Sequence, residues 1–191
     1  MRHMLDKLYK GSCWLAASCI AAIALLVVCQ VFLNLLDKLS IFFTGTAIGL
    51  TIPSYADFTG FLLAAASFFS LAYTLREGGH IRVTLVIGRL PVRIRKGAEL
   101  WCVAVAAGIT VYFTWYTAAL TWESYRYHDL SSGMIAVPIW IPQSAMLLGL
   151  LVLSLALVDE LFSIFTGKEP SYTGKGENLL VDEPDSVVRI E

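Results

Sequence analysis

The sequence has 191 residues, of which 57% are hydrophobic and only 15% are charged, with a formal net charge of −1. Soluble globular domains average roughly 45–50% apolar and about 25% charged residues. This composition, with a mean hydropathy of +0.69, therefore excludes an ordinary water-soluble domain, and it also excludes a disordered chain, a collagen-like repeat and a disulfide-rich secreted scaffold.

Four long apolar stretches follow one another along the chain, at about residues 13–36, 53–75, 98–122 and 139–165. Each exceeds the roughly 20 residues that cross a hydrocarbon core as a helix. A lipid-exposed span is helical because its backbone polar groups need partners within the segment. Transmembrane β-strands would instead be roughly ten-residue alternating segments. The sequence therefore predicts an all-α integral membrane protein with four transmembrane helices in a single domain over residues 1–165.

The first apolar stretch is too long for a cleaved signal peptide, and the segment after it is too apolar for a free loop. An apolar run over 13–36 exceeds the about 7–15 residues of a signal-peptide core, so we expect a retained helix. Residues 37–52 are too apolar for a free loop, and we expect them to lie against the membrane surface or a partner. The Gly-x-x-x-Gly spacing of Gly45 and Gly49 would suit close helix packing.

Lysine and arginine predict the orientation of the spans, because basic residues are enriched on the cytoplasmic side. The N-terminal tail, the loop between the second and third stretches and the C-terminal tail together hold 12 of the 14 basic residues. Both termini are therefore expected in the cytoplasm. Residues 166–191 carry Gly, Pro and six acids against three bases, which predicts a flexible acidic cytoplasmic tail.

Asp57 is the acid that falls clearly within a span, and intramembrane carboxylates serve as ion sites, proton relays or helix-pairing groups. Asn34 is expected at a similar depth, so a hydrogen bond between Asn34 and Asp57 is predicted as the leading interpretation. Gln30 lies one helical turn before Asn34 and would extend the polar stripe. A contact of this stripe with another subunit, or direct ion handling by Asp57, remains the alternative.

The loop after the second stretch reads Arg76-Glu77-Gly78-Gly79-His80-Ile81-Arg82-Val83. Its glycines permit a sharp turn where the chain leaves the membrane. Arg82, Arg89 and Arg93 would share one helix face, which indicates an amphipathic segment on anionic lipid, interrupted at Pro91. An ordinary basic loop is the alternative. Topology accounts for these basic residues, so no nucleic-acid partner is expected.

Signatures of enzymes are missing from the sequence: it has no P-loop, no Gly-x-Ser-x-Gly and no His-Glu-x-x-His. His3, His80 and His128 lie outside the spans, which argues against a membrane haem. Glu123, His128 and Asp129 would either line a solvated loop or bind a metal, and the solvated loop is preferred. The four cysteines fall in spans and are interpreted as packing residues. We therefore expect no catalytic site and no cofactor.

Two motifs in this topology resemble the small membrane subunit, DctQ-like, of tripartite ATP-independent periplasmic (TRAP) transporters. The first is Leu75–Val83 after the second span, and the second is Val137-Pro138-Ile139-Trp140-Ile141-Pro142 followed by Gly149. The resemblance covers about residues 10–165. Family members often carry Arg and Glu where this chain has Asn34 and Asp57, so a salt bridge there would become a hydrogen bond.

The resemblance implies a non-catalytic subunit of the bacterial inner membrane. It would scaffold a large multi-span permease that holds the sodium and solute sites, while a periplasmic binding protein delivers an organic acid. Residues expected at a subunit or lipid interface are Asn34, Asp57, Arg76, Glu77, Gly78, Gly79, His80, Arg82, Arg89, Arg93, Pro138, Trp140 and Pro142. The alternatives are a stand-alone small channel or exporter that uses Asp57, and a membrane-bound redox or transferase enzyme.

Overall fold

The computed structural model describes residues 2–77 and 92–166 of the chain, which form four α-helices. They are α1 (Arg2–Thr44), α2 (Tyr55–Arg76), α4 (Val92–Tyr127) and α5 (Trp140–Phe165). All four are long and apolar enough to cross a membrane. The prediction of an all-α protein with four candidate spans is thereby confirmed. The cytoplasmic placement of the termini and the amphipathic segment stay predictions, since residues 78–91 and 167–191 lie outside the described part.

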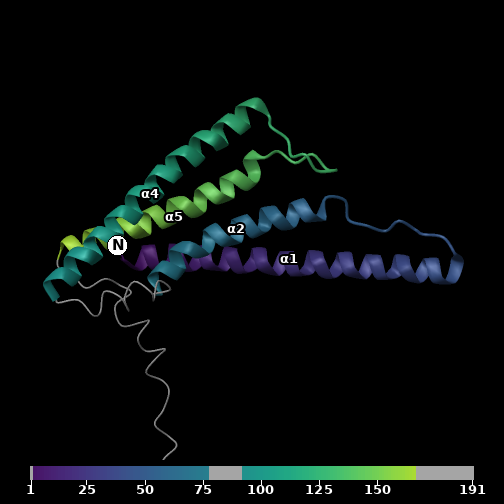
Figure 1. Ribbon diagram of the computed structural model, residues 1–191, viewed down its shortest axis with the longest axis horizontal. Helices are drawn as coiled ribbons and strands as arrows, with labels where there is room; N and C mark the ends of the chain where they lie inside the picture. The colour runs from purple at the N-terminus through teal and green to yellow at the C-terminus, as the bar shows by residue number, and fades with distance from the viewer. Residues whose placement is uncertain (1, 78–91, 167–191) are drawn as a thin grey trace, which may run out of the picture.

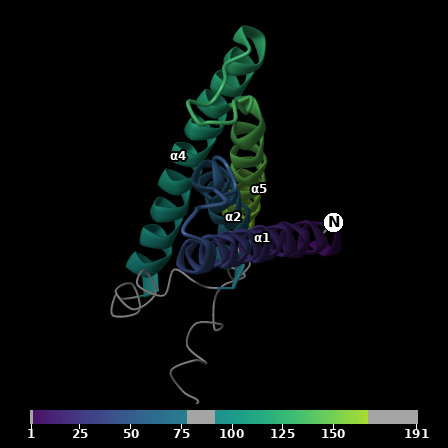
Figure 2. The ribbon, with the colours of Figure 1, turned by 90° about the vertical axis from the view of Figure 1, so that its right-hand side faces the viewer.

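The helices form an open row in the order α1, α2, α5, α4 rather than a closed four-helix ring. Helix α2 packs against α1 and α5, and α4 packs against α5, while α1 touches α5 only slightly. Figures 1 and 2 show α1 and α4 on opposite sides, with α2 and α5 between them, and the two outer helices diverging from a common end. The other described helices therefore leave one long face of α1 and one of α4 uncovered.

Two helices run well beyond the apolar stretches that predicted them. Helix α1 covers Arg2–Thr44 where the apolar stretch covers 13–36, and α4 covers Val92–Tyr127 where it covers 98–122. Helical hydrogen bonding does not stop where hydrophobicity stops, so a helix continues until its backbone is terminated. In α1 the terminator is Gly45, whose φ of 68° and bond from N–H to the Ile41 carbonyl form a left-handed C-cap. In α4 it is His128, with φ 53°.

The packed face of α1 follows a seven-residue repeat from Tyr9 to Ser40. All its buried residues and most of its half-buried ones in that range follow alternating steps of three and four: Tyr9, Ser12, Ala16, Cys19, Ile23, Leu26, Gln30, Leu33, Asp37 and Ser40. Such a repeat keeps one seam against a neighbour. The first part of the seam contacts α2, where the Ser12 hydroxyl donates a hydrogen bond to the Phe69 carbonyl oxygen. Small and polar residues dominate the seam, as expected where lipid competes with apolar side chains.

Helix α5 is the centre of the row and is held on both sides by close contacts. Toward α2, a Cβ built at Gly149 would lie 2.6 Å from the Phe68 carbonyl carbon, so only glycine allows this approach. Toward α4, the hydroxyls of Ser154 and Thr114 are 2.9 Å apart and share a hydrogen bond. The main buried cluster joins the helices near the N-terminus of α1, through Tyr9, Ala72, Leu75, Ala107, Ala156 and Leu157.

Candidate subunit interface

Most of the predicted interface residues that the structure describes lie at the two ends of the row, which we call the Tyr9 end and the Asp57 end. At the Tyr9 end, α2 finishes at Arg76 and Glu77 caps it. Arg76 Nη1 lies 2.8 Å from Asp6 Oδ1 of α1, an ion pair without the alignment of a hydrogen bond. The Arg76 guanidinium also lies over the Tyr9 ring, 5.0 Å from its centroid. Arg76 therefore joins the end of α2 to the start of α1 by two contacts, an ion pair and a cation–π contact.

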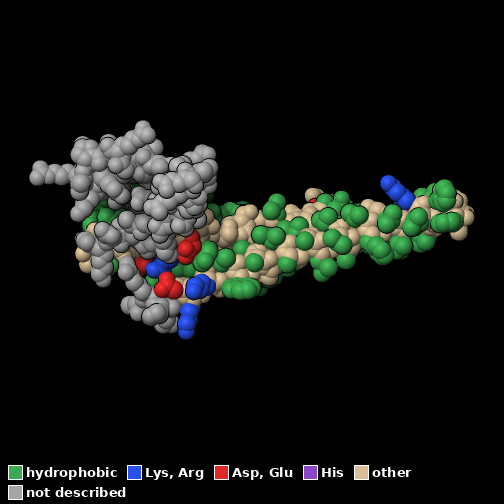
Figure 3. All heavy atoms as spheres, turned by 90° about the horizontal axis from the view of Figure 1, so that it is seen from below, with side chains coloured by type: hydrophobic (Ala, Val, Ile, Leu, Met, Phe, Trp, Pro, Cys, Tyr) green, Lys and Arg blue, Asp and Glu red, His purple; other side chains and the backbone are tan. Residues whose placement is uncertain are grey.

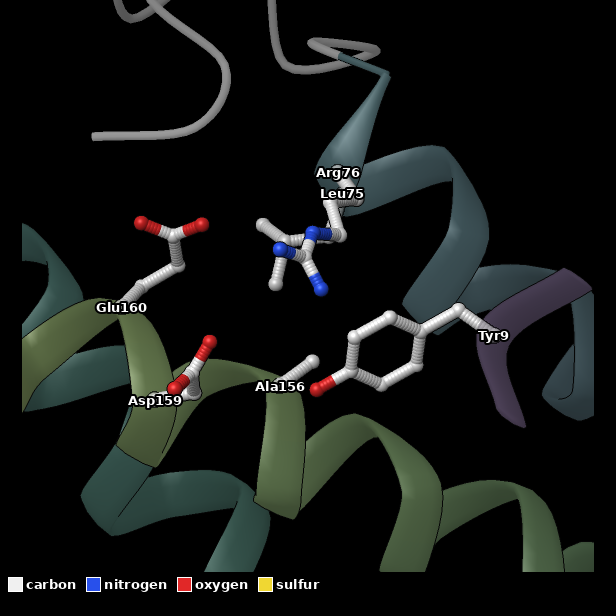
Figure 4. Close-up of a pocket in the computed structure, with 6 residues that line it drawn as sticks. All are labelled: Tyr9, Leu75, Arg76, Ala156, Asp159 and Glu160. Carbon is white, nitrogen blue, oxygen red and sulfur yellow. The ribbon is translucent and has the colours of Figure 1, made fainter. Parts of the chain in front are cut away.

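Figure 4 shows that side chains from three helices converge on one small pocket at this end. Tyr9 comes from α1, Leu75 and Arg76 from α2, and Ala156, Asp159 and Glu160 from α5. Arg76 is only 14% exposed, and the Glu160 carboxylate is buried. The Tyr9 hydroxyl is buried and makes no hydrogen bond to any described residue. The pocket is too small to hold a solute.

At the Asp57 end, Asp57 lies in the first turn of α2, directly beneath the loop that joins α4 to α5. Its carboxylate packs against Gly133, where an added Cβ would collide with it. The Ser54 hydroxyl accepts a hydrogen bond of 2.9 Å from the Ile135 N–H. Ser54 itself adopts a left-handed backbone, with φ 57°. The start of α2 therefore contacts the α4–α5 loop at two points, through Asp57 and through Ser54.

The expected hydrogen bond between Asn34 and Asp57 is not formed. Asn34 is exposed, and its amide oxygen accepts from Gln30 Nε2 at 3.2 Å. Gln30 also donates to Thr51 Oγ1, and its Oε1 accepts from the Ile52 N–H, both at 2.9 Å. The physical reason is that α1 continues past its apolar stretch to Thr44, so the chain must fold back along α1 before α2 begins. Gln30 binds this returning segment. The polar stripe therefore binds the returning segment through Gln30 and does not contact Asp57 by a hydrogen bond.

Gly45 and Gly49 do not pack helices together either. Both lie outside the helices, in the returning segment, and both have positive φ, 68° and 75°. A side chain at either position would meet no atom within 4 Å. Their spacing reflects two places where the backbone needs the left-handed region that glycine tolerates, not a close helix contact.

Pro138, Trp140 and Pro142 lie together where the α4–α5 loop enters α5. Pro138 forms an isolated β-bridge with Leu130, so the loop is a short hairpin. Trp140 begins α5, and its ring meets the Tyr125 ring of α4 edge-on at 5.6 Å between centroids. Pro142 falls in the first turn of α5, where a missing N–H leaves no helical bond unmade. The motif thus shapes the turn between two neighbouring helices.

Most of the basic loop lies outside the residues that the structure describes. Gly78, Gly79, His80, Arg82 and Arg89 belong to residues 78–91, which the structure does not describe. Arg93 lies in the first turn of α4, a continuous helix from Val92 into the third span. The structure therefore brings Arg76 and Glu77 together with Tyr9 and Asp6, and places the Asp57 and Pro138–Pro142 groups at the opposite end.

Hydrophobic side chains cover most of the exposed surface between the two ends. In the most apolar part of each helix, only 6% of α1 and 11% of α4 is buried within the chain, against 22% for α2 and 28% for α5. On the face in Figure 3, which is the α1 side of the molecule, green apolar side chains run along the helix while most charged groups gather at one end. The outer helices of the row are thus the surfaces with most apolar area left for lipid or protein.

Sequence reasoning missed Tyr9, Asp6, Asp37, Gly133 and the Thr114–Ser154 pair. The seven-residue spacing of small and polar residues from Tyr9 onward was a readable signal for Tyr9 and Asp37, which lie on it, but not for Asp6. No local signal marked Gly133, because its role depends on a loop contact with Asp57 across the fold. Among residues 2–77 and 92–166, no group of His, Cys, Asp and Glu side chains is arranged to hold a metal ion, Glu123, His128 and Asp129 included.

Comparisons with known proteins place the chain in a family. The family model described as "Tripartite ATP-independent periplasmic transporters, DctQ component" matches residues 23–167. Neither the curated proteins nor the solved structures gave a match. Transporters of this kind combine a small and a large permease component with a periplasmic binding protein. Because the match covers most of the chain, from the middle of α1 through α5, this chain belongs to the DctQ family, the small permease component of TRAP transporters.

Proposed function

We propose that this chain is a non-catalytic membrane scaffold, which braces the large permease subunit during sodium-coupled, binding-protein-dependent uptake of an organic acid. The observation that carries the proposal is the open row of helices with two apolar flanks. Helices of a protein that works alone can close into a bundle and gain packing contacts, whereas this open row leaves α1 and α4 each packed mainly on one neighbour and able to pack on a large partner.

The polar groups within the row support the same role. Gln30, Ser12, Thr114 and Ser154 are each engaged in hydrogen bonds that join segments of this chain. Asp57 sits at the edge of the row against Gly133 and not between helices. A path for a charged solute needs polar side chains that face a common channel. The sodium and solute sites therefore belong to the large permease in this proposal.

The orientation follows from the basic residues. In the proposal the Tyr9 end faces the cytoplasm of a bacterium, the Asp57 end faces the periplasm, and the protein lies in the inner membrane. Lys7, Lys10 and Arg76 all lie at the Tyr9 end, around one open hollow. Asp6 and Glu77 line the same hollow, but the orientation rule counts lysine and arginine on each side rather than net charge.

Uptake by cells or vesicles tests the proposal. The large permease and the binding protein are reconstituted with and without this chain, and sodium-driven uptake of candidate organic acids is measured. We expect co-purification of the two membrane subunits and loss of uptake without the small one. Uptake at an unchanged rate by the permease and binding protein alone would overturn the scaffold role.

The stand-alone exporter is separated from the scaffold by a second measurement. Liposomes that contain this chain alone are loaded with candidate solutes, and their release is compared for the natural protein and Asp57→Asn. The scaffold predicts no transport by either. Transport by the natural protein that Asp57→Asn abolishes would contradict it and support the exporter.

A further inference from the structure

The end of α1 and the segment that folds back along it form a projection, which we call the arm: residues 30–44 of α1 and residues 45–53. Figure 1 shows it extending well past the start of α2, away from every other helix. Its tip is the Phe42–Phe43 pair, whose rings pack edge-on with centroids 5.3 Å apart. Phe42 is 81% and Phe43 is 78% exposed. The described part of the chain thus leaves these rings uncovered.

The apolar surface of the arm faces all directions except one. Leu39, Ile41, Phe42 and Phe43 are consecutive or nearly so on a helix and point to different sides, and all are exposed. Ile48 of the returning segment is 63% exposed. A protein partner covers one face of a helix, whereas lipid surrounds it. The distribution therefore fits lipid better than a protein surface.

The remaining face of the arm is polar, and its side chains bind the backbone of the returning segment. Asp37 Oδ1 accepts from the N–H groups of Ile48 and Gly49, both at 2.8 Å. Gln30 Oε1 accepts from the Ile52 N–H, and Gln30 Nε2 donates to the Thr51 hydroxyl. Ser40 Oγ donates to the Thr46 carbonyl oxygen at 3.1 Å. Non-helical backbone at membrane depth is tolerated only where such partners replace water.

The length of α1 shows that its last turns reach beyond the hydrocarbon core. Residues 11–43 carry just two charged side chains, Asp37 and Lys38. At about 1.5 Å per residue they measure roughly 50 Å. A helix tilted by about 40°, the upper end of the usual range, places roughly 39 Å within a 30 Å hydrocarbon core. The last turns of α1 then lie in the headgroup layer beyond that core.

From these observations we infer that the arm is a lipid-embedded anchor, which lies in the boundary between acyl chains and headgroups of one leaflet. Its polar face satisfies its own non-helical backbone, and its apolar faces and Phe42–Phe43 tip contact lipid. Lys38, exposed on the same segment, reaches the headgroups by its long side chain. On the proposed orientation this is the periplasmic leaflet, but the lipid contact does not depend on that orientation.

Site-directed spin labelling in vesicles tests the inference. Cys13, Cys19, Cys29 and Cys102 are replaced by Ala in the full chain, and single cysteines are introduced as Phe43→Cys and Ile48→Cys. Val28→Cys, on the exposed middle of α1, serves as the lipid control in vesicles without the permease, and Ser132→Cys, in the α4–α5 loop, serves as the water control throughout. Vesicles of phosphatidylethanolamine and phosphatidylglycerol hold the protein with and without the permease. Collisions with oxygen and with a nickel chelate are then compared.

We expect both arm sites to favour oxygen over the nickel chelate several-fold more than Ser132→Cys does, with or without the permease. Two arm sites on different segments keep the test valid if one variant misfolds, which circular dichroism detects. Nickel access like that of Ser132→Cys would place the arm in water and overturn the inference. Loss of access to both reagents would overturn it too, in favour of a second copy if the permease is absent, or of the permease if it is needed. Co-purification and uptake report on the scaffold role independently of all these outcomes.

Discussion

The two halves of α1 use the same seven-residue seam for different purposes. At the Tyr9 end the seam carries Tyr9, Ser12 and Ala16, which pack directly against helices α2 and α5. In the arm it carries Gln30, Asp37 and Ser40, which bind the backbone of a non-helical segment. The first half is held by helix packing, and the second is held by side chain–backbone hydrogen bonds.

This difference shows why the larger polar side chains of α1 lie in the arm. In a membrane, apolar contact between helices gains little over contact with lipid, so close packing and hydrogen bonds decide which segments associate. Small residues suffice where two helices meet, because both helices satisfy their own backbones. A returning segment has no such internal bonds, so glutamine, aspartate and serine must be aligned with it.

The largest effect is expected where the packed part of the row depends on one glycine. Gly149→Val would drive a side chain into the Phe68 backbone, whose carbonyl carbon lies 2.6 Å from a Cβ at that position. Overpacking usually costs about 1–3 kcal/mol, and backbone atoms yield less than a flexible side chain, so we expect about 3 kcal/mol. The free energy of unfolding is measured by titration with sodium dodecyl sulfate, followed by circular dichroism.

Gly108→Val is the matched control, since it makes the same substitution in α4 where no atom lies within 4 Å of an added Cβ. We expect a change within about 0.5 kcal/mol. Equal losses in the two variants would mean that helix propensity, not the α2–α5 approach, sets the effect. A loss confined to Gly149→Val would show that the row is held by this close approach.

A smaller and local effect is expected in the arm. Gln30→Leu leaves the Ile52 N–H and the Thr51 hydroxyl without the partner they have at 2.9 Å. An unsatisfied polar group costs about 1–3 kcal/mol, and here the loss should open the returning segment without unfolding the helices. Hydrogen exchange at residues 46–53 should therefore become faster, while exchange in α5 stays unchanged.

Asn34→Leu provides the comparison for Gln30. Asn34 also bonds to Gln30 but touches the returning segment through no hydrogen bond, so its replacement should leave exchange at residues 46–53 nearly unchanged. Faster exchange of similar size in both variants would mean that the polar stripe as a whole, and not the Gln30 contact, holds the arm. Unchanged exchange in Gln30→Leu would mean that the Gln30 hydrogen bonds do not hold the returning segment in place.

The number and type of helices were predictable from the sequence because length and hydropathy constrain them directly. The family was predictable because its motifs, Leu75–Val83 and Val137–Pro142, are local in sequence. The Asn34–Asp57 hydrogen bond was wrong because depth was inferred from apolar runs, and α1 continues past its run to Gly45. The contacts of Gly133 with Asp57 and of Gly149 with Phe68 depend on how distant segments meet, which no single sequence window contains.

The smallest effect is expected at the Tyr9 end, where Arg76 joins two partners that remain partly satisfied without it. Arg76→Leu removes the ion pair with Asp6, which is 43% exposed, and the contact with the Tyr9 ring. A partly exposed ion pair contributes about 0.2–1 kcal/mol. A cation over an aromatic ring adds about 0.5–1 kcal/mol. We therefore expect a loss of about 1 kcal/mol in the free energy of unfolding.

Two variants divide that loss between its causes. Asp6→Asn keeps the guanidinium over the ring and should lose only a few tenths of a kcal/mol, the share of a half-exposed ion pair. Tyr9→Phe keeps the ring and removes a buried hydroxyl that bonds to no described residue, so it should be neutral or slightly stabilising. A loss in Asp6→Asn as large as in Arg76→Leu would assign the contact to charge pairing alone. A marked loss in Tyr9→Phe would mean that the hydroxyl has a partner, and that hydrogen bonds hold this end of α1 as they hold the arm.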